Sequence, residues 1–222
     1  MDKNKYYYLF VGGYVSLSLS FILFYSIIPN PYDFILKMLP ATLASVAAAM
    51  FAVTSKRKLL VVAFLGCAIG DMLLGINRVT LFMPALVSFM AANVILAVYL
   101  SKQSHRNTFS YIRLGITIVY TIIVSIVLIP SSGKMAVPVT LYILVIATMT
   151  ATAALYKGRK QWIVFAGAQI FMIGDSLIAF DKFVYPFNNS LVIIFSCYYT
   201  AIFLISTGLT QRPRSAINRK IL

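Results

Sequence analysis

The chain has 222 residues, of which 61% are hydrophobic and only 11% are charged. A soluble domain carries roughly 25% charged residues, so this composition excludes a water-exposed domain and predicts that a bilayer surrounds most of the chain. The net charge of +14 is divided into short basic clusters between apolar runs, which is typical of loops at a membrane surface and argues against a nucleic-acid partner.

Eight apolar runs follow one another along the chain. A membrane-spanning helix needs roughly 20 predominantly apolar residues, and charges, prolines and polar clusters separate runs of about this length. In chain order, we predict helices over approximately residues 6–28, 34–54, 59–76, 79–100, 111–130, 136–156, 161–180 and 190–210. No small-residue cleavage site follows the first run, so we expect a retained helix rather than a signal peptide. The fold class is therefore all-α, a polytopic bundle of about eight transmembrane helices that forms a single integral membrane domain over residues 1–222.

The basic residues predict the orientation of these helices, because cytoplasmic loops carry an excess of Lys and Arg. If the amino terminus is cytoplasmic, all but four of the Lys and Arg residues fall in cytoplasmic segments. The four exceptions lie one near each external turn and are Lys37, Arg78, Lys134 and Lys182. We expect a multi-pass protein of a cell membrane, such as the bacterial inner membrane, with both termini in the cytoplasm. The cytoplasmic set consists of Lys3, Lys5, Lys56, Arg57, Lys58, Lys102, Arg106, Arg113, Lys157, Arg159, Lys160, Arg212, Arg214, Arg219 and Lys220.

Two of the predicted helices end in similar sequences. Residues Gly70–Arg78 and Gly174–Lys182 share the pattern G-D-x-L-aliphatic-small-x-x-basic. Both helices follow a cytoplasmic basic cluster and run outward. The first four and the last four helices therefore form two parallel halves in one interpretation, as in several membrane proteins with internal repeats. Chance similarity between two apolar helices is the alternative.

Asp71 and Asp175 are the strongest candidates for catalytic residues. A carboxylate at mid-membrane costs roughly 2.5–3.5 kcal/mol on insertion scales, whereas an interhelical polar contact contributes only about 0.6 kcal/mol on average. Hydrogen bonding to a neighbouring helix, the structural alternative, therefore does not offset the cost. Both aspartates follow their basic cluster at a similar distance, so we expect them at one depth, in one pocket in the outer half of the bilayer.

Other polar residues near that level are candidates for substrate binding. They are Lys37, Asn93, Tyr142 and Tyr198. For Lys37 an alternative is that its ammonium extends to the outer membrane surface. Gly66 and Gly70 form a G-x-x-x-G step that we expect to serve close helix packing rather than chemistry.

Several chemistries are excluded by what the sequence lacks. The single histidine, His105, lies in a predicted cytoplasmic loop far from the aspartates, so neither a histidine-based triad nor a zinc site is expected. Cys67 and Cys197 both lie inside apolar runs and do not indicate a disulfide framework. No nucleotide-binding fingerprint is present. A carboxyl pair with a lysine and hydroxyls in an apolar pocket suits general acid–base catalysis without a metal or cofactor.

Several motifs resemble the YhhN family of integral membrane proteins. The segment Leu36–Pro40 is similar to the family's K-x-L-P segment, and Gly70–Leu74 matches its G-D-x-L-L step. Pro138, Tyr142 and Met149 have the spacing of its P-x-x-x-Y and following M. The most specific match is Gly167–Ala179, which is close to the family's G-A-x-L-F-x-x-S-D-x-x-L-A.

Three positions depart from the family pattern. Asn93 stands where the family has a histidine, Gly174 replaces the serine before the second aspartate, and Ile202 stands where a glutamine follows the tyrosine that is here Tyr198. The two aspartates and the lysine match the family.

The resemblance implies a lysoplasmalogenase, which hydrolyses the vinyl-ether bond of a lysophospholipid-type amphiphile to a fatty aldehyde and a glycerophospho-head-group. Enol-ether cleavage needs an acid that protonates carbon and a carboxylate that stabilises the oxocarbenium ion, a logic that parallels glycoside hydrolysis. Two alternatives remain. Intramembrane aspartates and a possible repeat also fit a proton-coupled or small-solute transporter, and the departures fit a non-catalytic lipid-binding protein.

Overall fold

The computed structural model describes residues 3–25, 27, 33–52, 56–104 and 108–210. His105 and the two residues after it in the predicted loop, which include Arg106, lie outside these residues, as do the basic residues after position 210. Within the described part, the chain forms eight long α-helices and one short 3-10 turn. The helices are α1 (Lys3–Phe24), α2 (Asp33–Phe51), α3 (Arg57–Ile76), α4 (Phe82–Ser101), α5 (Thr108–Ser131), α6 (Ala136–Leu155), α7 (Gln161–Phe183) and α8 (Ser190–Leu209), with the 3-10 turn η1 at Gly133–Met135.

All eight helices are long and apolar enough to cross a membrane, which confirms the predicted fold class. Their outer faces are apolar as well, and α5 shows this best because most of its large side chains point away from the bundle. Exposed residues on α5 include Ile112, Ile116, Val119, Ile123 and Ile126. Such a surface is compatible with lipid and not with water, so the chain is an integral, multi-pass membrane protein.

Two helix boundaries differ from the prediction for identifiable reasons. The helix predicted from residue 79 begins at Phe82, because the Asn77 side chain accepts hydrogen bonds from the backbone N–H groups of Val79 and Thr80, both at 2.9 Å, and forms a turn. The helix predicted from residue 111 begins at Thr108. Arg113 therefore lies in the second turn of α5, and its side chain is buried.

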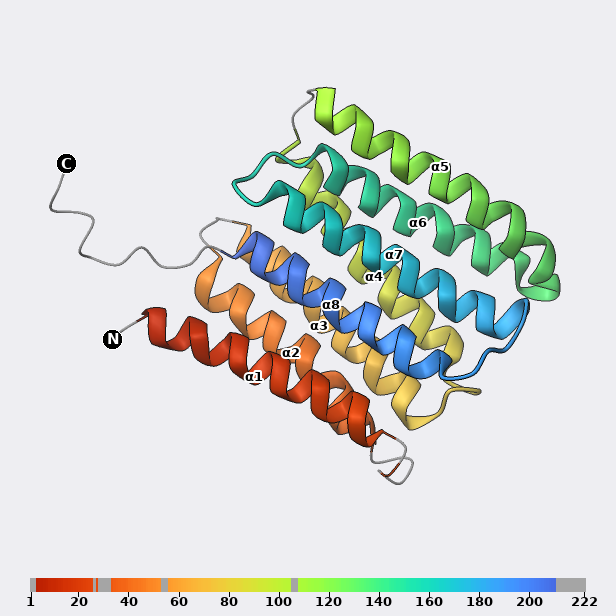
Figure 1. The fold of residues 1–222 in the computed structure, drawn as a ribbon, viewed down its shortest axis with the longest axis horizontal. Helices are drawn as coiled ribbons and strands as arrows, with labels where there is room; N and C mark the ends of the chain where they lie inside the picture. Colours follow the sequence, from red (N-terminus) through yellow and green to blue (C-terminus); the bar gives the residue numbers. More distant parts are fainter. Residues whose placement is uncertain (1–2, 26, 28–32, 53–55, 105–107, 211–222) are drawn as a thin grey trace, which may run out of the picture.

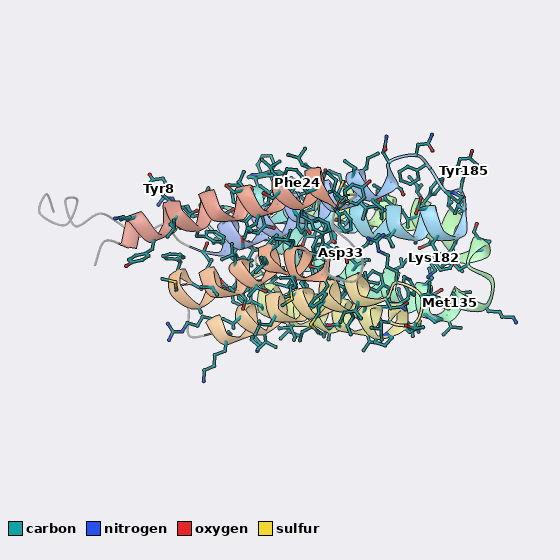
Figure 2. All side chains as sticks on the ribbon, turned by 90° about the horizontal axis from the view of Figure 1, so that it is seen from below. Tyr8, Phe24, Asp33, Met135, Lys182 and Tyr185 are labelled. Carbon is teal, nitrogen blue, oxygen red and sulfur yellow. The ribbon has the colours of Figure 1, made fainter. Side chains whose placement is uncertain are left out.

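The helices run nearly parallel or antiparallel to one another, with α1 and α5 at opposite edges (Figure 1). The start of α1 and the end of α8 lie at one end of the bundle, here called the terminal end; the other end, where α3 and α7 finish and α4 and α8 begin, is called the distal end (Figure 1). Figure 2 shows Lys182, Tyr185 and Met135 at the distal end and Tyr8 at the terminal end.

The contacts between helices bear on the predicted halves. If α1–α4 are matched in order with α5–α8, each contact between consecutive helices in the first half has a counterpart in the second half: α1–α2 with α5–α6, α2–α3 with α6–α7, and α3–α4 with α7–α8. The contact between α2 and α8 likewise has its counterpart between α6 and α4. The α1–α8 and α5–α7 contacts have no counterpart of similar extent. Most of the helix neighbours thus agree with two parallel halves, and the repeat itself stays a prediction.

The G-x-x-x-G step of α3 packs against α4, as predicted. A Cβ atom on Gly66 would lie 3.2 Å from the Ala92 Cβ, and one on Gly70 would lie 2.7 Å from the Phe89 ring. The Ser88 hydroxyl donates a hydrogen bond to the Gly66 carbonyl at 2.7 Å. The absence of side chains on this face lets the two helices approach closely, which fixes α3 and its aspartate relative to α4.

Candidate functional site

One cavity of about 90 Å³ lies among α2–α8 and extends toward the distal end. Its lining there includes Phe82, the first residue of α4, and Phe183, the last residue of α7. Apolar side chains make up most of the wall, and the polar lining residues are Lys37, Asp71, Tyr142, Asp175, Ser176 and Tyr198. A cavity of this size holds several water molecules, each of which needs about 10–15 Å³ of such space.

The two aspartates occupy equivalent positions on α3 and α7. Asp71 comes fourteen residues after Arg57, the first residue of α3, and Asp175 comes fourteen residues after Gln161, the first residue of α7 (71 − 57 = 175 − 161 = 14). The helices α3 and α7 run in the same direction (Figure 1), and both aspartates line the cavity. They are close enough that the charge of Asp71 acts on Asp175.

Each carboxyl group is held by one tyrosine. The Tyr198 hydroxyl, from α8, donates a hydrogen bond to Asp71 Oδ2 at 2.6 Å, and the Tyr142 hydroxyl, from α6, donates one to Asp175 Oδ2 at 2.5 Å. Among the described residues, the second oxygen of each carboxyl accepts no hydrogen bond from the protein. These oxygens are therefore available to a substrate or to water in the cavity.

Lys37 brings a positive charge to one side of the cavity. Only 2% of its surface is exposed, so the alternative in which it extends to the membrane surface does not fit the structure. Its ammonium lies 5.0 Å from the centre of the Phe195 ring, and Asp71 is among its electrostatic neighbours. The Lys37 carbonyl accepts a hydrogen bond from the Tyr199 hydroxyl at 3.2 Å, which ties this part of α2 to α8.

Asn93 is the one predicted site residue that does not line the cavity. It is fully buried on α4 with its side chain beside the Tyr142 hydroxyl, and among the described residues neither its amide nitrogen nor its oxygen has a hydrogen-bond partner. The structure thus places Asn93 behind Tyr142 rather than in contact with the space a substrate would occupy.

Sequence reasoning missed two further features of the site. Ser176, directly after Asp175, lines the cavity, although its hydroxyl donates to the Met172 carbonyl at 2.7 Å. Tyr199 forms a second layer, because its hydroxyl reaches α2 while its carbonyl accepts a hydrogen bond from Tyr14 of α1 at 2.8 Å. The adjacent tyrosines in α8 were a visible signal, but only the structure shows that they point to different helices. Across the described residues, no group of three or more His, Cys, Asp or Glu side chains could hold a metal ion.

Comparison with known families now adds to this geometry. Residues 32–209, which include both aspartates and both tyrosines, match the YhhN family. The chain belongs to the YhhN family. Over a stretch of 75 residues, the chain is 31% identical to the lysoplasmalogenase TMEM86B of Sus scrofa. That match covers 34% of this chain and 31% of the relative, so the chain spans under a third of that protein. No solved structure matches the chain.

The structure gives a packing reason for one departure from the YhhN pattern. Gly174, where the family has serine, faces α8, and a Cβ atom on it would lie 3.2 Å from the Cys197 Cβ. A larger residue would push α8, and with it Tyr198, away from α7. In this member of the YhhN family, glycine permits the close approach of the two helices.

Proposed function

We propose that this chain is a membrane hydrolase of the lysoplasmalogenase type, which cleaves the vinyl-ether bond of a lysoplasmalogen to a fatty aldehyde and a glycerophosphoethanolamine or glycerophosphocholine. The observation that carries the proposal is the pair of carboxyls that line one apolar cavity, each of which accepts a hydrogen bond from a tyrosine hydroxyl. Membership of the YhhN family and the name of the pig relative support the same reaction. A single-chain lipid suits the cavity because its chain is apolar and its polar linkage can reach the carboxyls.

The charges around the cavity suggest different roles for the two aspartates. Lys37 lies near Asp71, and its positive charge stabilises a carboxylate there. The electrostatic neighbours of Asp175 are Tyr142 and Asp71, neither of which is a cation. In the proposed mechanism Asp175 is the protonated acid and Asp71 is the ionised group that stabilises positive charge.

The reaction then proceeds in three steps. Asp175 transfers its proton to the vinyl carbon next to the alkyl chain, and the ether oxygen shares the resulting positive charge as an oxocarbenium ion near Asp71. Water adds to the vinyl carbon bonded to oxygen and returns a proton to a carboxylate, which gives a hemiacetal. The hemiacetal collapses to the aldehyde and the free glycerol hydroxyl.

The tyrosines orient this chemistry. Each donates to Oδ2 of its aspartate, so the other carboxyl oxygen faces the reacting atoms with a fixed direction. A positioned acid or base contributes roughly a hundredfold or more to the rate, which is the scale expected for each aspartate.

Aldehyde release by the purified protein in detergent tests the proposal. We expect turnover of a defined lysoplasmalogen and none of the ester-linked lysophospholipid with the same head group, because only the vinyl ether can be protonated on carbon. Turnover in detergent also separates hydrolysis from transport, which needs two compartments. In heavy water the aldehyde gains a single deuterium beside its carbonyl, and in oxygen-18 water the label enters the aldehyde and not the glycerol.

Substitution of the carboxyls tests the site. Asp71→Asn and Asp175→Asn should each lower the rate about a hundredfold or more. The matched control is Asp181→Asn, because Asp181 is on α7 too but accepts a hydrogen bond from the Phe187 N–H and does not line the cavity. Unchanged rates in both site variants would overturn the site, and label in the glycerol hydroxyl would overturn the mechanism.

A further inference from the structure

Two cations lie at the distal end of the cavity, outside the proposed catalytic machinery. Arg78 follows the end of α3 in the chain. Lys182 is in the last turn of α7, and Figure 2 shows it at the distal end. They occupy equivalent places in the two similar segments, since each comes seven residues after its aspartate (78 − 71 = 182 − 175 = 7). Both side chains are exposed.

Aromatic side chains of the cavity wall hold both cations near its opening. The Arg78 guanidinium lies 5.9 Å from the centre of the Phe195 ring, and the Lys182 ammonium lies 3.2 Å from the centre of the Phe82 ring. Phe195 and Phe82 both line the cavity. Cation–π contacts of this kind fix the charge above the ring while its N–H groups remain free to bind an anion.

Carboxylates do not neutralise these cations. In the described part of the chain, neither Arg78 nor Lys182 forms an ion pair or a hydrogen bond to a carboxylate. Asp181, which precedes Lys182 in the chain, accepts a hydrogen bond from the Phe187 N–H and not from Lys182. Lys37 is repelled by the charge of Arg78 and attracted by those of Asp71 and Asp33, so the one nearby carboxylate at the start of α2 acts on Lys37 and forms no ion pair with Arg78 or Lys182 among the described residues. The distal end of the cavity therefore carries positive charge that an anion would stabilise.

The depth of the carboxyls matches a glycerol spacer. Asp71 lies five residues before Ile76, the end of α3 (76 − 71 = 5), which at ~1.5 Å rise per residue is about 7–8 Å from the helix end. A lipid with its linkage at Asp71 would place its phosphate, one glycerol unit away, at the level of Arg78 and Lys182. Arginine and lysine are the side chains that bind phosphate in proteins.

We infer that Arg78 and Lys182 bind the phosphodiester of a single-chain phospholipid whose hydrocarbon chain occupies the cavity. The position of the linkage rests on the proposed function, whereas phosphate binding does not. The site selects lipids with a phosphate over neutral lipids of the same chain length, and it acts through charge rather than through the shape of the terminal head group.

Equilibrium binding in a non-ionic detergent tests the inference. The probes are an ester-linked lysophosphatidylethanolamine, which is no substrate under the proposed chemistry, and a monoacylglycerol with the same acyl chain. We expect the phospholipid to bind more tightly to the wild type. Arg78→Gln and Lys182→Gln should each weaken phospholipid binding about fivefold, since a basic residue near a membrane surface contributes about 1 kcal/mol, and should leave monoacylglycerol binding unchanged.

Lys134→Gln is the matched control, because Lys134 is exposed in η1, also at the distal end, but among the described contacts none joins it to an aromatic ring of the cavity wall. Equal affinity of the wild type for both lipids, an equal loss for both lipids in the variants, or the same loss in Lys134→Gln would overturn the inference. Inorganic phosphate that binds as tightly as the lysophospholipid would show a free-phosphate site instead. Failure of vinyl-ether hydrolysis leaves these binding results intact, so the two proposals can fail separately.

Discussion

Tyr142 and Tyr198 give each aspartate a single neutral donor in a cavity with an apolar wall. The aspartates could be found from sequence, because a carboxylate in a membrane helix is costly and the chain has few acids. Their tyrosine partners could be suspected but not paired, because the chain has 14 tyrosines and the pairing depends on how α6 and α8 face α7 and α3. Asn93 shows most clearly what the sequence could not predict. Its expected level in the membrane made it a candidate for substrate binding, but its side chain lies beside Tyr142 and does not line the cavity.

Removal of either tyrosine hydroxyl should slow catalysis without preventing folding. Tyr142→Phe and Tyr198→Phe keep the ring but leave a carboxyl without its donor. A hydrogen bond between neutral groups contributes roughly 0.5–1.5 kcal/mol and one to a charged group roughly 1.5–3 kcal/mol. We therefore expect kcat to fall about two- to tenfold in Tyr142→Phe, whose partner Asp175 is protonated, and about ten- to hundredfold in Tyr198→Phe, whose partner Asp71 is ionised. Aldehyde release at saturating lipid measures this. Tyr185→Phe is the control, because Tyr185 is 67% exposed at the distal end. Equal kcat in all three variants would contradict the positioning role.

At the scale of helices, the sequence predicted which segments span the membrane but not how closely they approach. Hydropathy and breaks are local signals, whereas the distance between two helices depends on which faces meet. Gly75 illustrates this, because hydropathy does not distinguish it from Gly115, and the repeated pattern around Asp71 marks it only as a small residue. A Cβ atom on Gly75 would overlap Phe34 and lie 2.6 Å from the Phe34 Cα, whereas one on Gly115 would meet nothing within 4 Å.

Gly75→Ala should therefore destabilise the bundle and impair the site together. The added methyl group must push α2 away from α3, and overpacking of this kind costs roughly 1–3 kcal/mol. Phe34 is three residues before Lys37, so the same shift moves Lys37 relative to Asp71. Thermal unfolding in detergent and the rate of aldehyde release measure the two effects. Gly115→Ala should be neutral or slightly stabilising, because alanine favours a helix over glycine by about 1 kcal/mol. Equal unfolding temperatures for both variants would refute the close contact.

At the scale of the whole molecule, the connections that carry most of the basic residues lie at the same end of the bundle. A backbone bridge joins Ser104 to Tyr156, so the α4–α5 and α6–α7 connections lie together at the terminal end. Basic residues are dense at that end. Lys160 there donates a hydrogen bond to the Thr207 carbonyl in the last turn of α8 at 2.7 Å, where a cation complements the partial negative charge of the helix end.

The orientation in the membrane follows from this arrangement as a prediction. Since the terminal end holds the basic connections, the positive-inside rule places it in the cytoplasm and places the distal end, with the cavity opening, outside. Reporter fusions at Ser104 and Gly158 should report the cytoplasm, and fusions at Ser132 and Asn188 should report the exterior, because the first pair and the second pair lie at opposite ends of the bundle. Opposite signals from Ser104 and Gly158 would contradict the eight-helix topology itself. The same signal from each pair but with the sides exchanged would keep the fold and reverse the orientation, which would place the phosphate-binding residues and the opening of the cavity at the cytoplasmic leaflet.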